Sequence, residues 1–182
     1  RKTLLVDSDP QGSARDWNEL SNPSIVPVVG LDRETIAKDL EAIWTGYDIV
    51  IIDGAPQIAK MSIAAVKIAD FVLIPVQPSP YDIWACADLV DIIRARQEVT
   101  EGKPKTAFVI SRFIRNTKLS REVYEALKEY DLPILKSVTT QRVLYPTSAS
   151  EGKTVLCGEE SNPAAQEIIS IRQEIMEMVY GS

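Results

Sequence analysis

The chain has 182 residues, 45% of which are hydrophobic, and a net charge of −6, so it holds enough apolar material for one well-packed domain. The absence of histidine excludes histidine-based acid–base catalysis and histidine metal ligands, and no apolar stretch reaches the ~20 residues that span a bilayer. The two cysteines, Cys86 and Cys157, are isolated and lack CxxC spacing, which favours a reducing, cytoplasmic compartment.

Short apolar segments alternate with helical segments along the whole chain. The continuous run Ile-Val-Ile-Ile at residues 49–52 is typical of a strand that is buried on both faces of a parallel sheet. Asn162 and Pro163 fit the N-cap and the first position of a final helix. Strands are predicted at residues 3–7, 25–29, 48–53, 71–75, 105–111 and 134–138, and helices at residues 14–20, 33–44, 62–69, 82–99, 119–130 and 163–180. The alternation predicts an α/β fold with a mostly parallel, doubly wound sheet and helices on both faces, in a single domain over residues 1–182.

Polar or rigid residues follow four of the predicted strands. Asp7 and Asp9 come after the first strand, Asp53 after the third, a proline-rich segment at residues 76–82 after the fourth, and Arg112 after the fifth. Ligands of such sheets bind at the carboxyl ends of the strands, so these residues predict a site at one sheet edge.

The three carboxylates suggest what such a site would bind. Without histidine or paired cysteines, carboxylate oxygens suit a hard cation such as magnesium, which usually contacts phosphates and keeps several waters. Asp53 ends the stretch YDIVIID and has the form of a Walker B carboxylate, which indicates phosphoryl chemistry. An ordinary turn or helix-capping aspartate would end a strand in the same way.

A phosphate loop of the form GxxxxGK[ST] is missing from the sequence. The nearest fragment, at residues 147–154, ends in Gly152-Lys153-Thr154 but begins with Thr147 where the first glycine should stand. No buried strand leads into it and no clear helix follows. We therefore predict an ordinary polar loop before Val155.

Four segments, in their order and spacing, resemble the ParA/MinD family of deviant Walker A partition ATPases, and most closely its small plasmid ParA (ParF-like) members. They are LLVDSDPQGSARDW, YDIVIIDGAP, VLIPVQPSPYDIWA and TTQRVLYPTSASEGKTVL, and the resemblance spans essentially the whole chain. It implies a P-loop NTPase type of fold that hydrolyses ATP with magnesium. In that family a strand, a phosphate loop with a signature lysine and a helix precede the first segment, so we expect an N-terminally truncated sequence whose phosphate-binding unit lies before Arg1.

The resemblance assigns roles to the acidic residues. Asp9 is the catalytic carboxylate that orients the attacking water, which is a large part of phosphoryl-transfer catalysis. Asp53 holds magnesium through water, and Asp7 is a supporting carboxylate near the metal or, alternatively, a buried turn residue. Gly54 and Pro56 shape a switch loop that responds to the γ-phosphate.

The proline-rich segment and Arg112 are assigned to nucleotide binding in the same way. Pro78, Ser79, Pro80 and Asp82 resemble the loop beside the nucleotide of the ATP-bound dimer, although Asp82 also fits a helix cap. Arg112 falls where relatives hold an Asn or Arg by the adenine, and its planar guanidinium can stack on a base. A surface salt bridge is the alternative for Arg112.

The charge is distributed unevenly along the chain. Residues 103–142 carry nine Lys/Arg and four Asp/Glu, a net charge of +5, whereas the remainder carries eleven and twenty-two, a net charge of −11. The resemblance implies an ATP-dependent homodimer that binds DNA non-specifically on the nucleoid, is stimulated by a ParB-type adaptor and has no membrane contact. Arg115, Lys118, Arg121 and Arg142 are the candidate phosphate contacts, and a solvated helix face would explain the same charges.

Other classes of protein fit less well. A receiver domain shares the acidic residues but needs a lysine where Arg112 stands, and a cluster-binding relative of the same fold needs cysteines that Cys86 and Cys157 do not match. The remaining alternative is a degenerate, non-hydrolysing module that binds DNA or an adaptor and lacks the phosphate loop.

Overall fold

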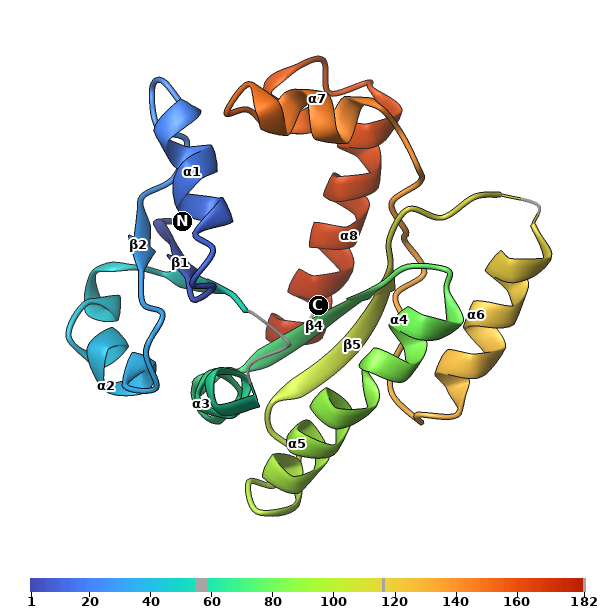
Figure 1. The fold of residues 1–182 in the computed structure, drawn as a ribbon, viewed down its shortest axis with the longest axis horizontal. Helices are drawn as coiled ribbons and strands as arrows, with labels where there is room; N and C mark the ends of the chain where they lie inside the picture. The colour runs from blue at the N-terminus through green and yellow to red at the C-terminus, as the bar shows by residue number, and fades with distance from the viewer. Residues whose placement is uncertain (55–58, 116, 182) are drawn as a thin grey trace. The chain divides into compact units, whose positions relative to one another are not determined.

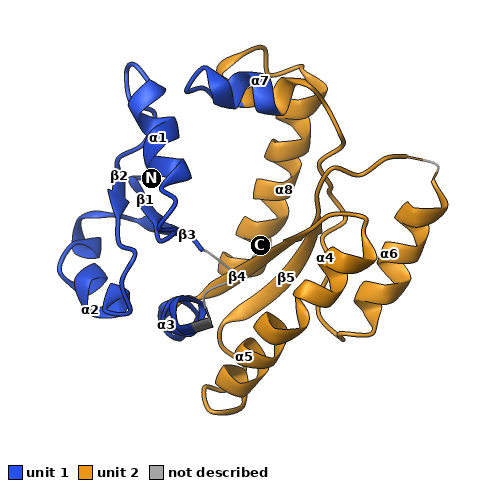
Figure 2. Cartoon of the chain, in the orientation of Figure 1, with its two compact units in different colours: residues 1–68, 146–154 blue, residues 69–145, 155–182 orange. Residues whose placement is uncertain are grey.

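A computed structural model describes residues 1–54, 59–115 and 117–181 (Figure 1). The described part forms two compact units, one of residues 1–68 with 146–154 and one of residues 69–145 with 155–182 (Figure 2). The single domain expected from the sequence stays a prediction. None of the described helices is long and apolar enough to cross a membrane.

Unit 1 is built on three parallel strands in the order β2-β1-β3. The strands are β1 (Thr3–Asp7), β2 (Val28–Gly30) and β3 (Ile49–Asp53), and the helices are α1 (Ser13–Leu20), α2 (Ile36–Glu41), the short 3-10 helix η1 (Trp44–Gly46) and α3 (Ala59–Ile68). The core joins Leu4 and Val6 of β1 to Ile36 and Leu40 of α2, all nearly fully buried. This packing fixes the end of β1 from which the acidic segment emerges.

Unit 2 is built on two parallel strands, β4 (Phe71–Val76) and β5 (Lys105–Ile110). Its helices are α4 (Pro80–Ala85), α5 (Ala87–Glu98), α6 (Lys118–Lys128), the short 3-10 helix η2 (Val155–Cys157) and α8 (Pro163–Tyr180); α7 (Leu144–Ser150) begins in unit 2 and continues into unit 1. Ala107 and Val109 pack with Ile171 of α8, whereas the ring of Phe108 packs near Tyr130 after α6. Helices therefore cover both faces of β5. The burial on both faces predicted for residues 49–52 is not found in β3, where Ile51 is 52% exposed.

The prediction of an α/β fold with parallel strands and flanking helices is confirmed. Strand β1 and helix α8 have the predicted bounds, and the side chain of Asn162 accepts a hydrogen bond from the N–H of Ala164 as the predicted N-cap does. The helix predicted at 82–99 is interrupted at Cys86, where the Cys86 N–H bonds to Ile83 and the helix restarts as α5.

Two further predictions of secondary structure are wrong. Residues 134–138 form no strand, because only Ile134 bridges to Phe108, and the N–H groups of Lys136 and Ser137 bond to the side chain of Glu174 on α8. Part of the segment predicted as a polar loop, residues 147–154, forms the end of α7. It is not a phosphate loop, because a turn of helix occupies the position where the first glycine of such a loop would lie.

Candidate functional site

The register of unit 1 brings Asp7 and Asp53 together at the carboxyl ends of neighbouring strands. The two residues are paired directly across β1 and β3. Ser8 reinforces the pairing, because its N–H and its Oγ both donate to the backbone carbonyl of Asp53, at 3.0 and 2.7 Å. Asp9 follows two residues after the end of β1. The parallel topology thus gathers the three predicted carboxylates at one edge of this sheet.

Asp7 is fully buried and its carboxylate is already occupied. Oδ1 accepts the N–H of Asp9 at 3.1 Å, and Oδ2 accepts the N–H of Arg15 at 3.0 Å and its Nε at 3.4 Å. These contacts support the turn-residue alternative for Asp7, because both oxygens stabilise the segment that follows. A role near magnesium remains a prediction for this residue.

Hydrogen bonds fix the backbone of Asp9, and one oxygen of its carboxylate is left to accept a further hydrogen bond. Its Oδ1 accepts the N–H of Gln11 at 2.9 Å, and its carbonyl accepts the N–H of Gly12 at 3.0 Å. Gly12 has φ = 73° and precedes α1, so the tight turn uses the conformation that glycine adopts without strain. Among the described residues, Oδ2 of Asp9 has no hydrogen-bond partner.

Asp53 is exposed, and no described residue hydrogen-bonds to its carboxylate. The pKa of Asp53 is raised, first because the group is partly desolvated and then because the negative charges of Asp7 and Asp9 lie close to it. A cation would relieve this repulsion. The described residues contain no group of three or more Asp, Glu, Cys or His side chains arranged to ligate a metal directly. The predicted contact through water is compatible with that finding, and Pro56 lies outside the described residues.

In unit 2, the segment after β4 is tied to the first turn of α4. Asp82 accepts the N–H of Gln77 at 3.2 Å, and Ser79 is the residue before the helix, with Pro80 at its first position. Ser79 makes no side-chain cap, so the side chain of Asp82 closes this turn instead. Pro78 lies between these groups in the rigid segment that the sequence predicts.

Arg112 lies at the same edge of the sheet of unit 2 as Gln77, because Val76 and Ile110 are paired across β4 and β5. Its Nη1 donates to Gln77 Oε1 at 3.3 Å, and its N–H donates to Thr139 Oγ1 at 3.2 Å. Its φ of 55° is unusual for a residue other than glycine. The alternative for Arg112, a surface salt bridge, is not found among the described residues, and the residue is exposed.

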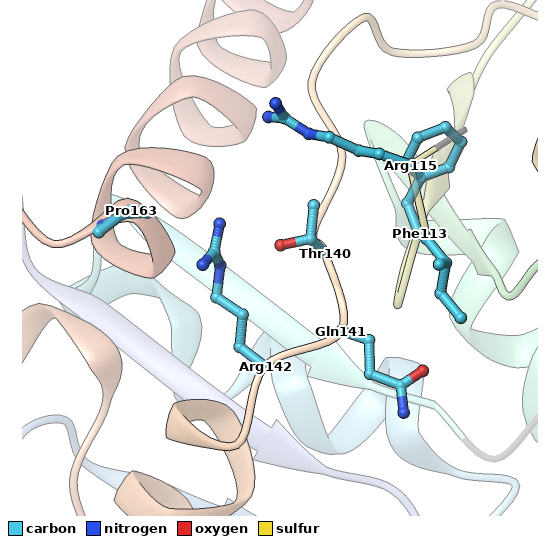
Figure 3. A pocket seen from close by; sticks show the side chains of 7 residues that line it. Phe113, Arg115, Thr140, Gln141, Arg142 and Pro163 are labelled. Carbon is cyan, nitrogen blue, oxygen red and sulfur yellow. The ribbon is translucent and has the colours of Figure 1, made fainter. Parts of the chain in front are cut away.

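The four predicted DNA contacts have different surroundings in unit 2. Lys118 pairs with Glu122 at 3.1 Å, and Arg142 pairs with Glu167 at 2.9 Å. Arg115 and Arg121 are exposed and lie within 4 Å of no described acidic group. Arg115 and Arg142 line an open pocket of about 690 Å³ together with Phe113 and Thr140, and both guanidinium groups extend to the same side of it (Figure 3).

Sequence reasoning missed Glu167, which organises the wall of this pocket. Its carboxylate accepts hydrogen bonds from Thr140, Arg142 and Tyr145. Burial opposes ionisation of Glu167, but these hydrogen bonds outweigh it and lower its pKa to about 2. No local pattern could reveal the group, because Glu167 lies more than twenty residues after Thr140, Arg142 and Tyr145.

Sequence reasoning also missed the role of Gly152 in unit 1. A Cβ at this position would fall on the backbone of Leu20 and Ser21, and the φ of Gly152 is 65°. Ser21 Oγ bonds to the carbonyl of Gly152, and Trp17 Nε1 bonds to the carbonyl of Lys153 at 3.1 Å. The glycine that resembled part of a phosphate loop therefore allows close packing against the end of α1.

Known proteins show consistent similarities to the chain. A family model described as an AAA domain matches residues 26–108. Maintenance of carboxysome distribution protein A from Halothiobacillus neapolitanus is 29% identical over 94% of this chain and 82% of its own length. Sporulation initiation inhibitor protein Soj from Bacillus subtilis is 25% identical over 96% of this chain and 86% of its own length. The structure of the septum site-determining protein MinD from Pyrococcus horikoshii with Mg-ADP has a TM-score of 0.72 and 13% identity, and covers 99% of this chain and 85% of that one.

Proposed function

We propose, from the premise that this chain belongs to the ParA/MinD family of partition ATPases, that it serves a magnesium- and ATP-dependent cycle that distributes a cargo within the cell. The family is one of ATP hydrolases. One observation carries the proposal for this chain: Asp7 and Asp53 are paired at the ends of adjacent parallel strands, with Asp9 beside them. Their shared edge is where ligands of such sheets bind.

The donor chemistry at this edge fits magnesium. The carboxylates of Asp7, Asp9 and Asp53 lie at this edge, and Asp53 is exposed beside the two other negative charges. Asp53 would hold the ion through water, whereas Asp7 would support the segment that carries Asp9. When bound, magnesium neutralises charge on the phosphates of the nucleotide.

Asp9 would orient the water that attacks the γ-phosphate. Its backbone is fixed by hydrogen bonds at both ends of the turn, while Oδ2 is free of partners among the described residues. A fixed carboxylate with an available oxygen can accept a hydrogen bond from water and hold that water in line. Pro78, Ser79 and Asp82, together with Arg112, are proposed as nucleotide-binding residues. No GxxxxGK[ST] loop occurs within the 182 residues, so no residue here is assigned to the phosphate cradle.

The partners are proposed on the strength of the family. They are a second copy of the chain with ATP, DNA bound without sequence preference, and an adaptor of the ParB type. Exposed Arg115 and Arg121 support the DNA contact, because free guanidinium groups bind phosphates in a sequence-independent manner. Cytoplasmic, nucleoid-associated localisation would follow from that contact.

The cargo is proposed to be a plasmid or chromosome, as the similarity to the chromosome partitioning protein ParA from Myxococcus xanthus supports. The similarity to a carboxysome distribution protein favours a second candidate cargo, a carboxysome. Fluorescence microscopy of the tagged full-length protein with a labelled replicon and a labelled carboxysome would separate the two. Deletion should scatter or cluster the true cargo only.

The test of the activity is ATP hydrolysis by the full-length protein with magnesium and DNA. Asp9→Ala should bind ATP but lose hydrolysis. Asp53→Asn should weaken magnesium binding, so that a higher magnesium concentration is needed for half-maximal turnover. Asp16→Asn is the control, because Asp16 is an exposed carboxylate on α1. Normal turnover by Asp9→Ala would overturn the role of Asp9. No magnesium-dependent turnover by the unmodified protein would favour the alternative, a non-hydrolysing binding module.

A further inference from the structure

Arg15 connects three segments at the acidic edge of unit 1. Its backbone N–H and Nε both donate to the buried Asp7, at 3.0 and 3.4 Å. Its Nη2 donates to the backbone carbonyl of Asp9 at 3.2 Å and lies 3.8 Å from Asp32 after β2. A single side chain therefore bonds to the end of β1, to the Asp9 turn and to the segment that follows β2.

Two glycines leave room for the guanidinium of Arg15. A Cβ at Gly30 would lie 2.8 Å from Nη1, and a Cβ at Gly12 would lie 3.0 Å from Nη2. Gly30 has no left-handed backbone angle that would itself require glycine. The absence of a side chain at Gly30 thus has a local reason, which is the space that Arg15 occupies.

The charge on Asp7 requires a partner. The side chain of Asp7 is 0% exposed, and a buried carboxylate without a partner is strongly destabilising. Arg15 supplies the compensating charge from a position that is 39% exposed. Because the same guanidinium also holds the carbonyl of Asp9, the ion pair and the conformation of the Asp9 turn depend on one residue.

We infer that Arg15 is a positioning residue that holds the turn at residues 8–12 in place, and with it the carboxylate of Asp9. The kinetic part of this inference rests on the proposed function of Asp9, whereas the ordering of the turn does not. Arg15 touches no reacting atom. It acts by fixing the backbone from which Asp9 projects and by keeping Asp7 directed into the sheet.

The first experiment measures hydrogen exchange of the peptide that covers residues 8–16 in the nucleotide-free, full-length protein. Arg15→Met should raise its exchange rate by about tenfold or more, the factor expected when hydrogen bonds between charged groups are lost. Gly30→Ala should raise it less, because its Cβ displaces the guanidinium without removing it. Arg33→Met is the matched control, since Arg33 is an exposed arginine of the same unit. Exchange in Arg15→Met equal to that of the control would overturn the inference.

The second experiment separates positioning from folding. Arg15→Met should lower kcat by roughly 10- to 100-fold and leave KM for ATP within about twofold, because misplacing a group by about an ångström has that effect on rate. Arg15→Lys should restore part of kcat, since an ammonium can still reach Asp7. A parallel loss of kcat and ATP binding, without rescue by lysine, would show a merely structural role.

Misfolding of Arg15→Met and failure of the proposed role of Asp9 must each be distinguished from failure of the inference about Arg15. If Arg15→Met fails to fold, the double variant Asp7→Asn/Arg15→Met removes the buried charge with its partner, and faster exchange at residues 8–16 in that variant is the expected result. If Asp9→Ala hydrolyses ATP normally, the proposed role of Asp9 fails, but the exchange measurement still decides whether Arg15 orders the turn. Unchanged exchange in the folded double variant would overturn the inference.

Discussion

Glu167 accepts hydrogen bonds from both Nε and Nη2 of Arg142 on one oxygen, at 3.1 and 2.9 Å. The same carboxylate receives the N–H and Oγ1 of Thr140 and the hydroxyl of Tyr145. One side chain of α8 thus anchors Thr140, Arg142 and Tyr145 to that helix. Glu174, two turns further along α8, binds the N–H groups of Lys136 and Ser137 in the same manner.

From the hydrogen bonds of Glu167 we predict that the free energy of unfolding falls at low pH. The pKa of Glu167 is about 2 in the folded protein, below its ordinary value of 4.5, so its ionised form is stabilised by folding. This stabilisation is fully present above pH 4.5 and is lost as the pH falls from 4.5 to about 2. Glu167→Gln should lower the free energy of unfolding of unit 2 by about 2 kcal/mol at pH 7, the range for hydrogen bonds to charged groups.

Urea denaturation of wild type and variant at pH 7 and pH 3 measures this effect. The difference between them should shrink at pH 3, because the wild-type carboxylate has lost part of its advantage there. Glu177→Gln, on an exposed residue of the same helix, is the control and should behave as wild type. A difference that is independent of pH would contradict the assignment.

Sequence patterns predicted correctly those helices and strands that depend mainly on their own residues. The apolar run of β5 and the Asn162–Pro163 start of α8 carry their own signals in sequence. The segment at 134–138 reads as a strand by the same criteria, and Leu135 does bond to Phe108 beside β5. The N–H groups of Lys136 and Ser137 instead bond to Glu174, which is 38 and 37 residues away, and this competition is not visible in any local window.

In the candidate site, too, some features could be predicted from the sequence and others depend on residues far apart in the chain. Asp7, Asp9 and Asp53 could be predicted because parallel strands must end at a common edge. The pairing of Asp7 with Arg15 could not, because arginine on a short helix usually faces solvent. Distances between side chains depend on how α1 packs, and that depends on Gly152, which lies more than 130 residues further along the chain.

The close packing at Gly152 predicts that any side chain at this position destabilises unit 1. Gly152→Ala should lower the free energy of unfolding by about 2–3 kcal/mol, because the new Cβ falls on the backbone of Leu20 and Ser21 and the left-handed φ is also strained. Gly152→Val should cost more. Gly46→Ala is the control, since a Cβ at Gly46 meets no atom within 4 Å.

Denaturation followed by tryptophan fluorescence suits this measurement, provided that Trp44 and Trp84 are replaced by Phe so that Trp17 alone reports. Trp17 bonds to Lys153 next to the substituted position. Equal stability of the Gly152 and Gly46 variants would show that the segment at 146–154 does not pack on α1 in solution.

The two cysteines should react at very different rates. Burial, followed by the nearby charge of Asp82, raises the pKa of the Cys86 thiol to about 11, and its Sγ donates to the carbonyl of Asp82 at 3.1 Å. Compared with a thiol at its ordinary value of 9.0, the thiolate fraction of Cys86 at pH 8 is about 100-fold lower. Cys157 is exposed.

Iodoacetamide labelling at pH 8, followed by peptide mass spectrometry, should therefore modify Cys157 and leave Cys86 unmodified until the protein is denatured. Urea provides the internal control, because both thiols become accessible in the unfolded chain. Rapid labelling of Cys86 in the native protein would show that the junction of α4 and α5 opens.

The basic residues of unit 2 should contribute unequally to DNA binding. Arg115 and Arg121 are exposed and have no acidic neighbour within 4 Å among the described residues, whereas the charge of Arg142 is offset by Glu167. Arg115→Ala and Arg121→Ala should each weaken binding to DNA of any sequence and reduce the slope of log K against log salt by about 1. Arg142→Ala should change that slope less, because its guanidinium must leave Glu167 before it can release a counterion from DNA.

Lys128→Ala, which removes an exposed lysine paired with Glu125, is the control for loss of charge alone. Fluorescence anisotropy of a labelled duplex with the full-length, ATP-bound protein, repeated over a range of salt concentrations, measures these slopes. If Arg115 and Arg121 leave the slope at the control value, their positive charges face solvent and the DNA contact lies elsewhere.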